Sequence, residues 1–440
     1  MLDLHSTDNE IKGSFAQKIT FFEYLYVFVL IIYAGRANTL VTNDSFTQNP
    51  IGVFLPIILT GILALKWKVK FEPRFFLLIF CLAIYFLAIS LKYSIIQPTF
   101  FLVYLFIFFT AYTFVKALKS DLFKIYEYLL FYLAIISLFF WSIQLLLGGD
   151  TLYYLFNRIP GIDEFSYVSG SGFNAIIYSL QPTYTTFINN FTVPRNCGFA
   201  WEPGSFAVYI CLAIFINLFA SPGGNKRLRF WLLTFALLST ESTTGYIIYV
   251  VIILFYLLNR NLKLILLILP FLLVALIYLS SLSFMSNKIV ELIDETKGIN
   301  QLVVDTYGRE TSATPQRFTS FLIAFKDFTN NPILGLGAHK EASWTYKLGS
   351  NISTISGIGN LLAQFGIVGF LFFIILSVKS SFFFAKYFNY NGKYLFLIVI
   401  ILISISYGVI LVPMVMSFWM YQFFDSDYDS QQKGEKMVLS

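Results

Sequence analysis

Three charged residues of this chain have the types and positions needed to act on a phosphorylated substrate at a membrane surface: Arg195, Glu202 and Arg317. Arginine holds phosphate oxygens through paired N–H groups, which suits it to binding a diphosphate. A carboxylate can take a proton from an attacking hydroxyl group. Arg195 and Glu202 directly precede a hydrophobic run that begins near Ser205, so Glu202 could act there as a base and the arginines could hold a diphosphate.

Each of these residues also has a simpler interpretation. Arg195 could extend its charge to the lipid surface or pair with Glu202. Glu202 could only stabilise the helix that follows Pro203, because a carboxylate at a helix start lies near the positive end of the helix dipole. Arg317 stands at the start of a predicted helix, where it could bind an anion or form a salt bridge to Glu310. The residues alone leave these alternatives open.

Aromatic side chains in the polar loops could stack on sugar rings, although loop aromatics more often serve packing. The candidates for substrate binding are Trp201, Tyr184, Trp344 and Tyr346. Trp201 stands beside Glu202, and an indole at the start of a membrane span prefers the level of the lipid headgroups. We therefore expect Trp201 near the membrane surface.

The chain contains two histidines, His5 and His339, and three scattered cysteines. This inventory argues against a histidine-based metal site, and the cysteines have neither the spacing of a metal site nor that of a disulfide framework. His339 lies beside a Gly-x-Gly turn, where it could contact a substrate. No GxGxxG, Walker or GxSxG motif is present, so nucleotide-driven chemistry has no support. We expect no metal and no cofactor.

The composition identifies a membrane protein. Hydrophobic residues make up 57% of the 440 residues and charged residues only 12%, and the mean hydropathy is +0.72. Since a membrane-spanning helix needs about 20 apolar residues, we predict an all-α, polytopic helix bundle of about 11–12 spans that forms a single integral membrane domain, residues 1–440. The predicted spans are 19–35, 50–65, 75–91, 99–115, 125–147, 204–220, 230–241, 244–258, 264–282, 357–378 and 394–412, with 413–424 as a twelfth span or a re-entrant segment.

Two long polar segments interrupt the series, at 148–203 and 283–355. Seventeen Lys and Arg residues fall in the short loops on one side of the membrane and two, Arg36 and Lys92, on the other. The positive-inside rule therefore places the N-terminus in the cytoplasm and both long loops outside. The net charge of +6 mostly reflects this asymmetry and gives no support for nucleic-acid binding.

The long loops are predicted to carry short amphipathic helices. In the second loop, one apolar face is formed by Met285, Ile289, Leu292 and Ile293. A stronger one has the spacing of a single helix face, and Asn331-Pro332 should end that helix. We expect this helix to lie on the bilayer or to cap the bundle. Its face consists of Phe318, Phe321, Leu322, Phe325 and Phe328.

Four short segments between about residues 195 and 380 form an ordered set. They are Arg195-Asn196-Cys197-Gly198 with Glu202-Pro203-Gly204; Leu238-Ser239 with Thr244-Gly245-Tyr246; Arg317 with Asn331-Pro332-Ile333-Leu334-Gly335-Leu336-Gly337; and Gln364-Phe365-Gly366-Ile367-Val368-Gly369-Phe370. Their order and the topology resemble the bacterial O-antigen polymerase and O-antigen ligase superfamily, lipid-linked glycan transferases of the outer face of the inner membrane.

The resemblance implies a glycosyltransferase that joins repeat units of an O-antigen or capsule carried on a polyprenyl diphosphate. It implies membrane lipid and a lipid-linked oligosaccharide as partners, with a chain-length regulator and a flippase as further ones, in the bacterial inner membrane. The ligase branch carries a His about nine residues before the Gly-x-x-Gly, where this chain has Ile355 followed by Ser356. His339 lies too far upstream to match, which favours a polymerase.

Two other functions stay open. One is an O-antigen ligase, which differs from a polymerase in its acceptor. The other is a lipid-linked glycan flippase or transporter. A transporter typically shows internal repeats and charged residues at mid-membrane, whereas this chain shows no similarity between halves and few charges within its spans beyond Glu23 and Glu127.

Overall fold

The structure is a computed structural model, and the fold is described from the residues whose placement it defines. These are 19–35, 50–156, 163–167, 170–181, 184–186, 192–220, 226–260, 299–305, 307–308, 313, 315–408 and 411–424. The predicted apolar face from Met285 to Ile293 and the predicted span 264–282 lie outside them.

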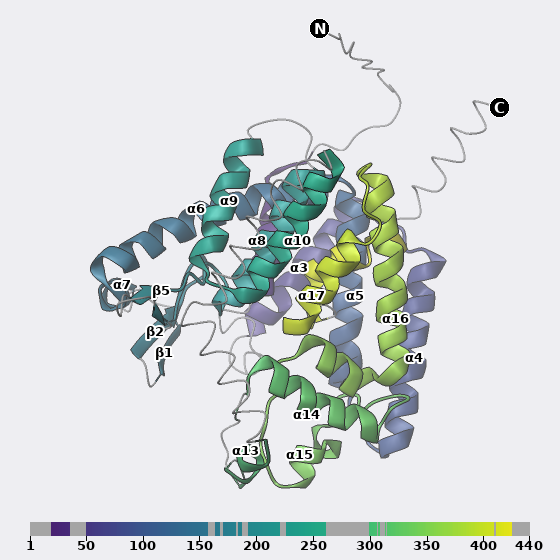
Figure 1. The fold of residues 1–440 in the computed structure, drawn as a ribbon. Helices are drawn as coiled ribbons and strands as arrows, with labels where there is room; N and C mark the ends of the chain where they lie inside the picture. The colour runs from purple at the N-terminus through teal and green to yellow at the C-terminus, as the bar shows by residue number, and fades with distance from the viewer. Residues whose placement is uncertain are drawn as a thin grey trace, which may run out of the picture.

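Long apolar helices form the bundle, which confirms the predicted all-α membrane fold (Figure 1). Among the described residues, four helices are long and apolar enough to cross a membrane: α4 (Pro73–Tyr93), α5 (Pro98–Leu118), α6 (Asp121–Leu147) and α16 (Gly357–Tyr387). Shorter helices occupy other predicted spans, namely α1 (Phe21–Gly35), α3 (Pro50–Lys66), α8 (Pro203–Phe219), α9 (Lys226–Ser239), α10 (Thr243–Arg260) and α17 (Leu395–Ser406).

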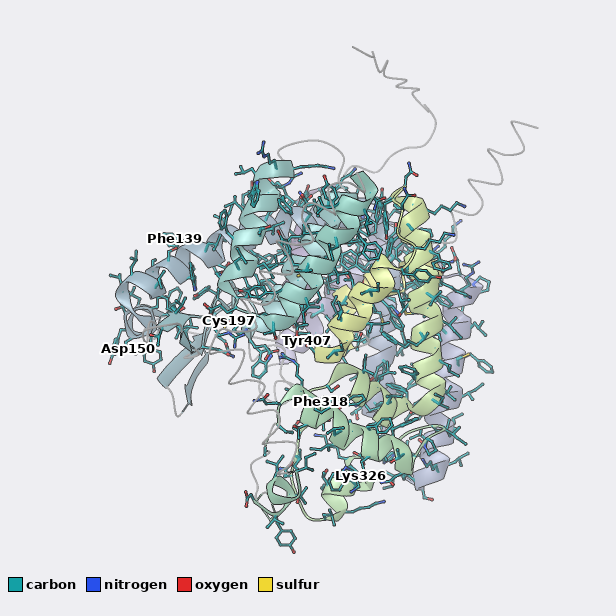
Figure 2. The ribbon with its side chains drawn as sticks, viewed as in Figure 1. Phe139, Asp150, Cys197, Phe318, Lys326 and Tyr407 are labelled. Atoms are coloured by element: carbon teal, nitrogen blue, oxygen red, sulfur yellow. The ribbon has the colours of Figure 1, made fainter. Side chains whose placement is uncertain are left out.

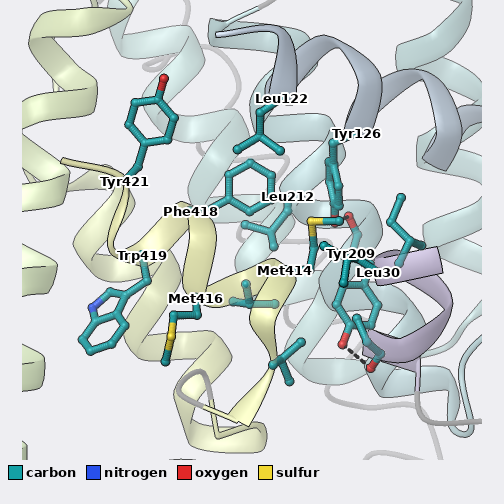
Figure 3. Packing of buried hydrophobic residues seen from close by; sticks show 14 of the residues in the cluster. Leu30, Leu122, Tyr126, Tyr209, Leu212, Met414, Met416, Phe418, Trp419 and Tyr421 are labelled. Carbon is teal, nitrogen blue, oxygen red and sulfur yellow. Dashed lines mark hydrogen bonds between the residues drawn. The ribbon is translucent and has the colours of Figure 1, made fainter. Parts of the chain in front are cut away.

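Helix α8 lies at the centre of the bundle, and nearly all of its residues are buried. It packs against α6, α9 and α10. Tyr209 of α8 links two neighbours, because its hydroxyl donates to the carbonyl oxygen of Ala34 (2.6 Å) and its own carbonyl accepts from the Tyr126 hydroxyl (3.1 Å). Figure 3 shows Tyr209 and Leu212 of α8 beside Met414 and Phe418. The start of α8, which carries Glu202, is therefore held rigidly.

The segment 413–424 does not form a span. It folds into two short helices, α18 (Pro413–Trp419) and α19 (Tyr421–Phe424), and most of its residues are buried. Neither helix approaches the length that a bilayer requires. The indole of Trp419 donates to Ser377 Oγ (2.8 Å), which fixes α18 against α16.

The first long loop contains strands that the sequence reading missed. After α7 (Gly149–Phe156), β1 (Asp163–Tyr167), β2 (Gly170–Asn174) and β3 (Ser179–Leu180) form an antiparallel sheet, and β4 (Tyr184–Thr186) pairs with β5 (Thr192–Pro194). A small core of Leu152, Phe173 and Tyr178 joins the sheet to α7. Strands β3, β4 and β5 have only two or three residues each, and β2 contains two glycines, so these strands show little of the alternation between apolar and polar side chains that predicts a strand.

The second long loop contains α13 (Ile299–Asp305), α14 (Arg317–Asn330), the short 3-10 helix η3 (Lys340–Ala342) and α15 (Trp344–Lys347). Helix α14 is the predicted amphipathic helix, and it ends before Asn331-Pro332 as expected. It packs against α16 (Figure 1). The loop is therefore attached to the helix bundle along the length of α14.

A break in α16 holds this loop in place. Gly366 has φ 60° and ψ −158°, so the helix is interrupted there. The segment after α14 lies along the break, where the backbone N–H groups of Leu336 and Gly337 donate to the carbonyl oxygens of Ala363 and Gln364 (2.8 Å each). A Cβ on Gly366 would collide with the backbone at Ile333. The Gly-x-Gly and Gly-x-x-Gly segments thus form one joint, and their glycines are needed for the close backbone contact.

Candidate active site

Glu202 and Arg317, which stand far apart in the sequence, form an ion pair. Arg317 Nη2 lies 2.8 Å from Glu202 Oε1. The hydroxyl of Tyr407 donates to the same oxygen, and the guanidinium of Arg317 lies 5.8 Å from the centre of the Tyr407 ring. A carboxylate, a guanidinium and a phenol therefore meet at one point, close to where Tyr407 and Phe318 are labelled in Figure 2.

The backbone presents Glu202 to this cluster. Glu202 is the N-cap residue of α8 with φ −141° and ψ 154°, and Pro203 follows as the first helical residue. The Glu202 side chain makes no capping hydrogen bond to the helix. Its carboxylate points instead to Arg317 and Tyr407, so helix capping by this side chain does not account for its position.

Arg317 is the first residue of α14, where an arginine opposes the helix dipole. Burial lowers its pKa, but the negative charge of Glu202 and the hydrogen bonds to Tyr407 and Glu202 outweigh this effect and raise the pKa overall. Its Nε is buried and has no hydrogen-bond partner among the described residues. The partner expected from the sequence, Glu310, lies outside the described residues, whereas the structure shows Glu202 in that role.

Tyr407 was not predicted. It caps the C-terminal end of α17, and the start of α16 at Gly357 packs against its carbonyl oxygen. In the sequence it is one of 28 tyrosines and stands inside a predicted apolar span, so no local pattern distinguishes it. Only the meeting of α17 with α8 and α14 shows its contact with Glu202.

Gly204 leaves room for the cluster. A Cβ at this position would lie 3.2 Å from Arg317 Nη2, 3.3 Å from the Tyr407 hydroxyl and 3.6 Å from Ser242 Oγ. Any larger residue would therefore press on the guanidinium. Gly204 also connects the cluster to the turn between α9 and α10, because Ser242 belongs to that turn.

Arg195 binds this same turn. Its Nε donates to the carbonyl oxygen of Thr240 (3.3 Å) and its Nη2 to that of Glu241 (3.2 Å). The next residue, Asn196, donates to Ser239 Oγ (2.9 Å). Arg195 thus pairs with backbone carbonyls rather than with Glu202. The turn that it binds therefore includes Ser242, which lies beside Gly204.

Among the described residues, three helices begin around this cluster. Helix α14 begins with Arg317, α8 has Gly204 in its first turn and α10 begins after Ser242. The first N–H groups of a helix have no partner within the helix, and the helix dipole makes this end positive. Together with Arg317, three such ends favour a bound anion at the cluster.

The chain was compared with families of known proteins. Residues 228–374 match the family model described as O-Antigen ligase. The match places this segment of the chain in the O-antigen ligase and polymerase superfamily. The matched segment contains Arg317 and the joint between the second loop and α16, while Arg195 and Glu202 precede it. No curated protein matches the chain.

The family match supports a general activity. It indicates a membrane protein that processes glycans in the manner of a glycosyltransferase, and it implies a lipid-linked oligosaccharide as the substrate. The cluster suits such a substrate, because it places positive charge for a diphosphate beside a carboxylate that can accept a proton.

The predicted sugar-stacking residues lie in different surroundings. Trp201 is 41% exposed and stands directly before Glu202. Tyr184 is in β4, and the backbone register places it opposite Pro194, next to Arg195. Tyr346 is exposed, whereas Trp344 is buried and its indole donates to the Ile323 carbonyl oxygen (3.1 Å). Trp344 therefore packs against α14.

His339 lies at the other end of α14 from Arg317. Its ring centre is 4.6 Å from that of Tyr93, whose hydroxyl donates to Asn331 at the C-terminus of α14. A helix of 14 residues is about 20 Å long, which separates His339 from the cluster. Burial lowers the pKa of His339. The structure does not bring His339 together with Glu202 and the arginines.

Proposed function

We propose that the protein is a polymerase that joins the repeat units of an O-antigen or capsular polysaccharide. The donor is a growing glycan on a polyprenyl diphosphate, and the acceptor is a single lipid-linked repeat unit. The observation that supports this proposal is the contact between Glu202 and Arg317 at the place where α8, α10 and α14 begin. A proton acceptor and an anion site stand side by side, as a transfer from a diphosphate requires.

The reaction follows from these positions. A hydroxyl oxygen of the acceptor bonds to the anomeric carbon of the donor, and the bond from this carbon to the diphosphate oxygen breaks. The electron pair of the broken bond leaves with the polyprenyl diphosphate, whose charge the arginines stabilise. The hydroxyl proton passes to Glu202. Because Arg317 and Tyr407 both bind Oε1, we assign Oε2 as the atom that takes the proton.

The ion pair also has a role in this proposal. In the structure, Arg317 neutralises Glu202. A diphosphate carries more negative charge than a carboxylate and competes for the guanidinium. Binding of the donor draws Arg317 toward the diphosphate and leaves Glu202 available as a base. The enzyme thus gains its base when its donor is in place.

Two observations favour a polymerase over the alternatives. Ser356, which follows the position of the ligase histidine, is committed to structure, because its Oγ accepts from the Gly359 N–H and caps α16. The two acidic residues noted within the spans are paired, Glu23 with Lys66 (2.6 Å) and Glu127 with Arg229 (2.9 Å). A ligase is the second candidate, since the family model itself is described as O-Antigen ligase.

The proposal is tested by Glu202→Gln, which keeps the shape of the side chain and removes the base. We expect chain elongation to fall by about 10²–10⁴-fold, while the protein stays in the membrane. A matched control exists in Glu72, which also caps a helix before a proline and pairs with a cation, Lys116. Glu72→Gln should leave the glycan ladder on a gel unchanged.

The arginines are tested by Arg195→Lys and Arg317→Lys at matched expression. Lysine keeps the charge but not the planar fork, so both variants should produce shortened glycan. Normal polymer from both lysine variants, or from Glu202→Gln, would refute the proposed site. Long chains that accumulate on the lipid carrier without being attached would indicate a ligase. The proposed setting is the bacterial inner membrane, where a flippase supplies the repeat units and a chain-length regulator is a further partner.

A further inference from the structure

Helix α14 has its aromatic face turned outward. The face that packs against the protein consists of small and polar residues together with one isoleucine: Thr319, Ser320, Ile323, Ala324 and Asp327. On the opposite side, Phe318 is 45% exposed and Phe325 is 41% exposed. In water such an arrangement is unfavourable, because burying apolar surface lowers the free energy and leaving it exposed does not. The outer face therefore needs an apolar partner.

The phenylalanines on this side form a stripe, in which Phe318 and Phe325 are exposed and Phe321 and Phe328 are partly buried. Phe321 stacks on Phe325 with ring centres 5.8 Å apart, and Phe325 lies 5.6 Å from Phe328. From Phe318 to Phe328 the helix rises about 15 Å. Beyond the end of the helix, Ile333 is also exposed and extends the apolar surface.

One end of this stripe adjoins the candidate active site. Phe318 directly follows Arg317, which binds Glu202 and lies against Tyr407. Phe318 and Lys326 mark the two ends of the outer part of α14 in Figure 2, and the Phe318 end lies toward Tyr407. The anion site at Arg317 and the apolar surface that leads away from it match the two parts of an amphipathic ligand, which has a charged head and a hydrocarbon chain.

We propose that the stripe of Phe318, Phe321, Phe325 and Phe328 binds the first isoprene units of the polyprenyl carrier whose diphosphate lies at Arg317. This inference rests on the proposed function, since it takes the diphosphate as the charged group. The branched, unsaturated carrier packs against the stacked rings through ordinary hydrophobic and dispersion contacts. The stripe fixes the direction in which the carrier leaves the site, and so orients the bond that breaks.

The test compares two probes on the purified full-length protein in phosphatidylcholine nanodiscs. One is undecaprenyl diphosphate and the other is inorganic pyrophosphate, which carries the charge without the chain. The double variant Phe318→Ala, Phe325→Ala removes two exposed rings and opens no internal cavity. We expect it to bind undecaprenyl diphosphate about tenfold more weakly and pyrophosphate as the unaltered protein does. The control Phe76→Ala removes a 60% exposed ring from α4 and should change neither affinity.

The outcomes separate this inference from the proposed function. Unchanged affinity for undecaprenyl diphosphate in the double variant would overturn the inference and show that the stripe contacts only the bilayer. An equal loss for both probes would also overturn it, because the effect would then lie in the anion site. If Arg317→Lys bound both probes normally, the proposed diphosphate site at Arg317 would be refuted. A selective loss of undecaprenyl diphosphate binding in the double variant would still support binding of the carrier to the stripe.

Discussion

Gly204→Ala should separate stability from activity. The added Cβ would lie 3.2 Å from Arg317 Nη2 and 3.3 Å from the Tyr407 hydroxyl, so the guanidinium must move by a few tenths of an ångström. The colliding atom ends a flexible side chain, which lets the fold accommodate the methyl group. Alanine also restricts the unfolded chain and favours a helix, a gain of about 0.4–1 kcal/mol.

Activity should respond in the opposite direction. Since a misplacement of about 1 Å can cost on the order of 10²-fold in rate, a displacement of a few tenths predicts a loss of about tenfold. The assay measures chain elongation and thermal unfolding of the same purified variant. Gly61→Ala is the control, because it adds a methyl group within α3 where nothing lies within 4 Å. A Gly204→Ala protein with unchanged elongation, or one that loses activity only because it unfolds, would refute the reasoning.

Two further predictions concern topology and pH. Reporters fused after Lys70 or Lys119 should give a cytoplasmic signal, and reporters inserted near Gly170 or Gly298 an external one; a cytoplasmic signal at Gly170 would contradict the whole orientation. Burial raises the pKa of Asp327 from 3.8 to about 6, so the folded protein binds this proton more tightly than the unfolded chain does. Stability should therefore fall, by up to about 3 kcal/mol, as the pH rises from about 4 to about 6. Asp327→Asn still accepts from the Trp344 N–H and should remove this fall in thermal unfolding; a variant with the same pH dependence would exclude Asp327 as its source.

Much of the bundle could be predicted from the sequence, because hydrocarbon excludes unpaired backbone groups and forces long apolar runs into helices. The spacing of the phenylalanines likewise predicted α14. Periodicity identifies an apolar face without saying what it touches, and here the small and polar face packs inward. The strands β1 to β5 were missed because most of them are too short to show a clear alternation of apolar and polar residues.

For the site, chemistry selected Glu202 and Arg317 as candidates. The structure brings them into direct contact, which could not be predicted from residues so far apart in the sequence. Tyr407 was missed because its role depends on where α17 ends relative to α8. Trp344 was proposed for sugar stacking, but its indole is buried. Lys326 Nζ lies over the indole, 4.0 Å from the ring centre. His339 stands beside the Gly-x-Gly turn, as its position in the sequence indicates. The length of α14 separates it from Glu202 and Arg317.

The joint between the second loop and α16 gives the sequence motifs a physical meaning. Gly335 has φ 71° and Gly366 has φ 60°, conformations that favour glycine. Tyr85 reinforces the joint, because its hydroxyl lies within hydrogen-bond distance of the carbonyl oxygens of Leu334 (2.9 Å) and Gln364 (2.6 Å). This joint fixes the far end of α14, and through the helix it fixes Arg317.

The central claim is tested most directly with the purified protein and a single kind of glycan substrate, the lipid-linked repeat unit. If the protein is a polymerase with Glu202 as its base, the products lengthen by one repeat unit at a time, and one polyprenyl diphosphate is released for each new linkage. The Glu202→Gln protein forms no ladder under the same conditions. Failure of the unaltered protein to lengthen single units, together with transfer of preformed chains to a different acceptor, would contradict the account.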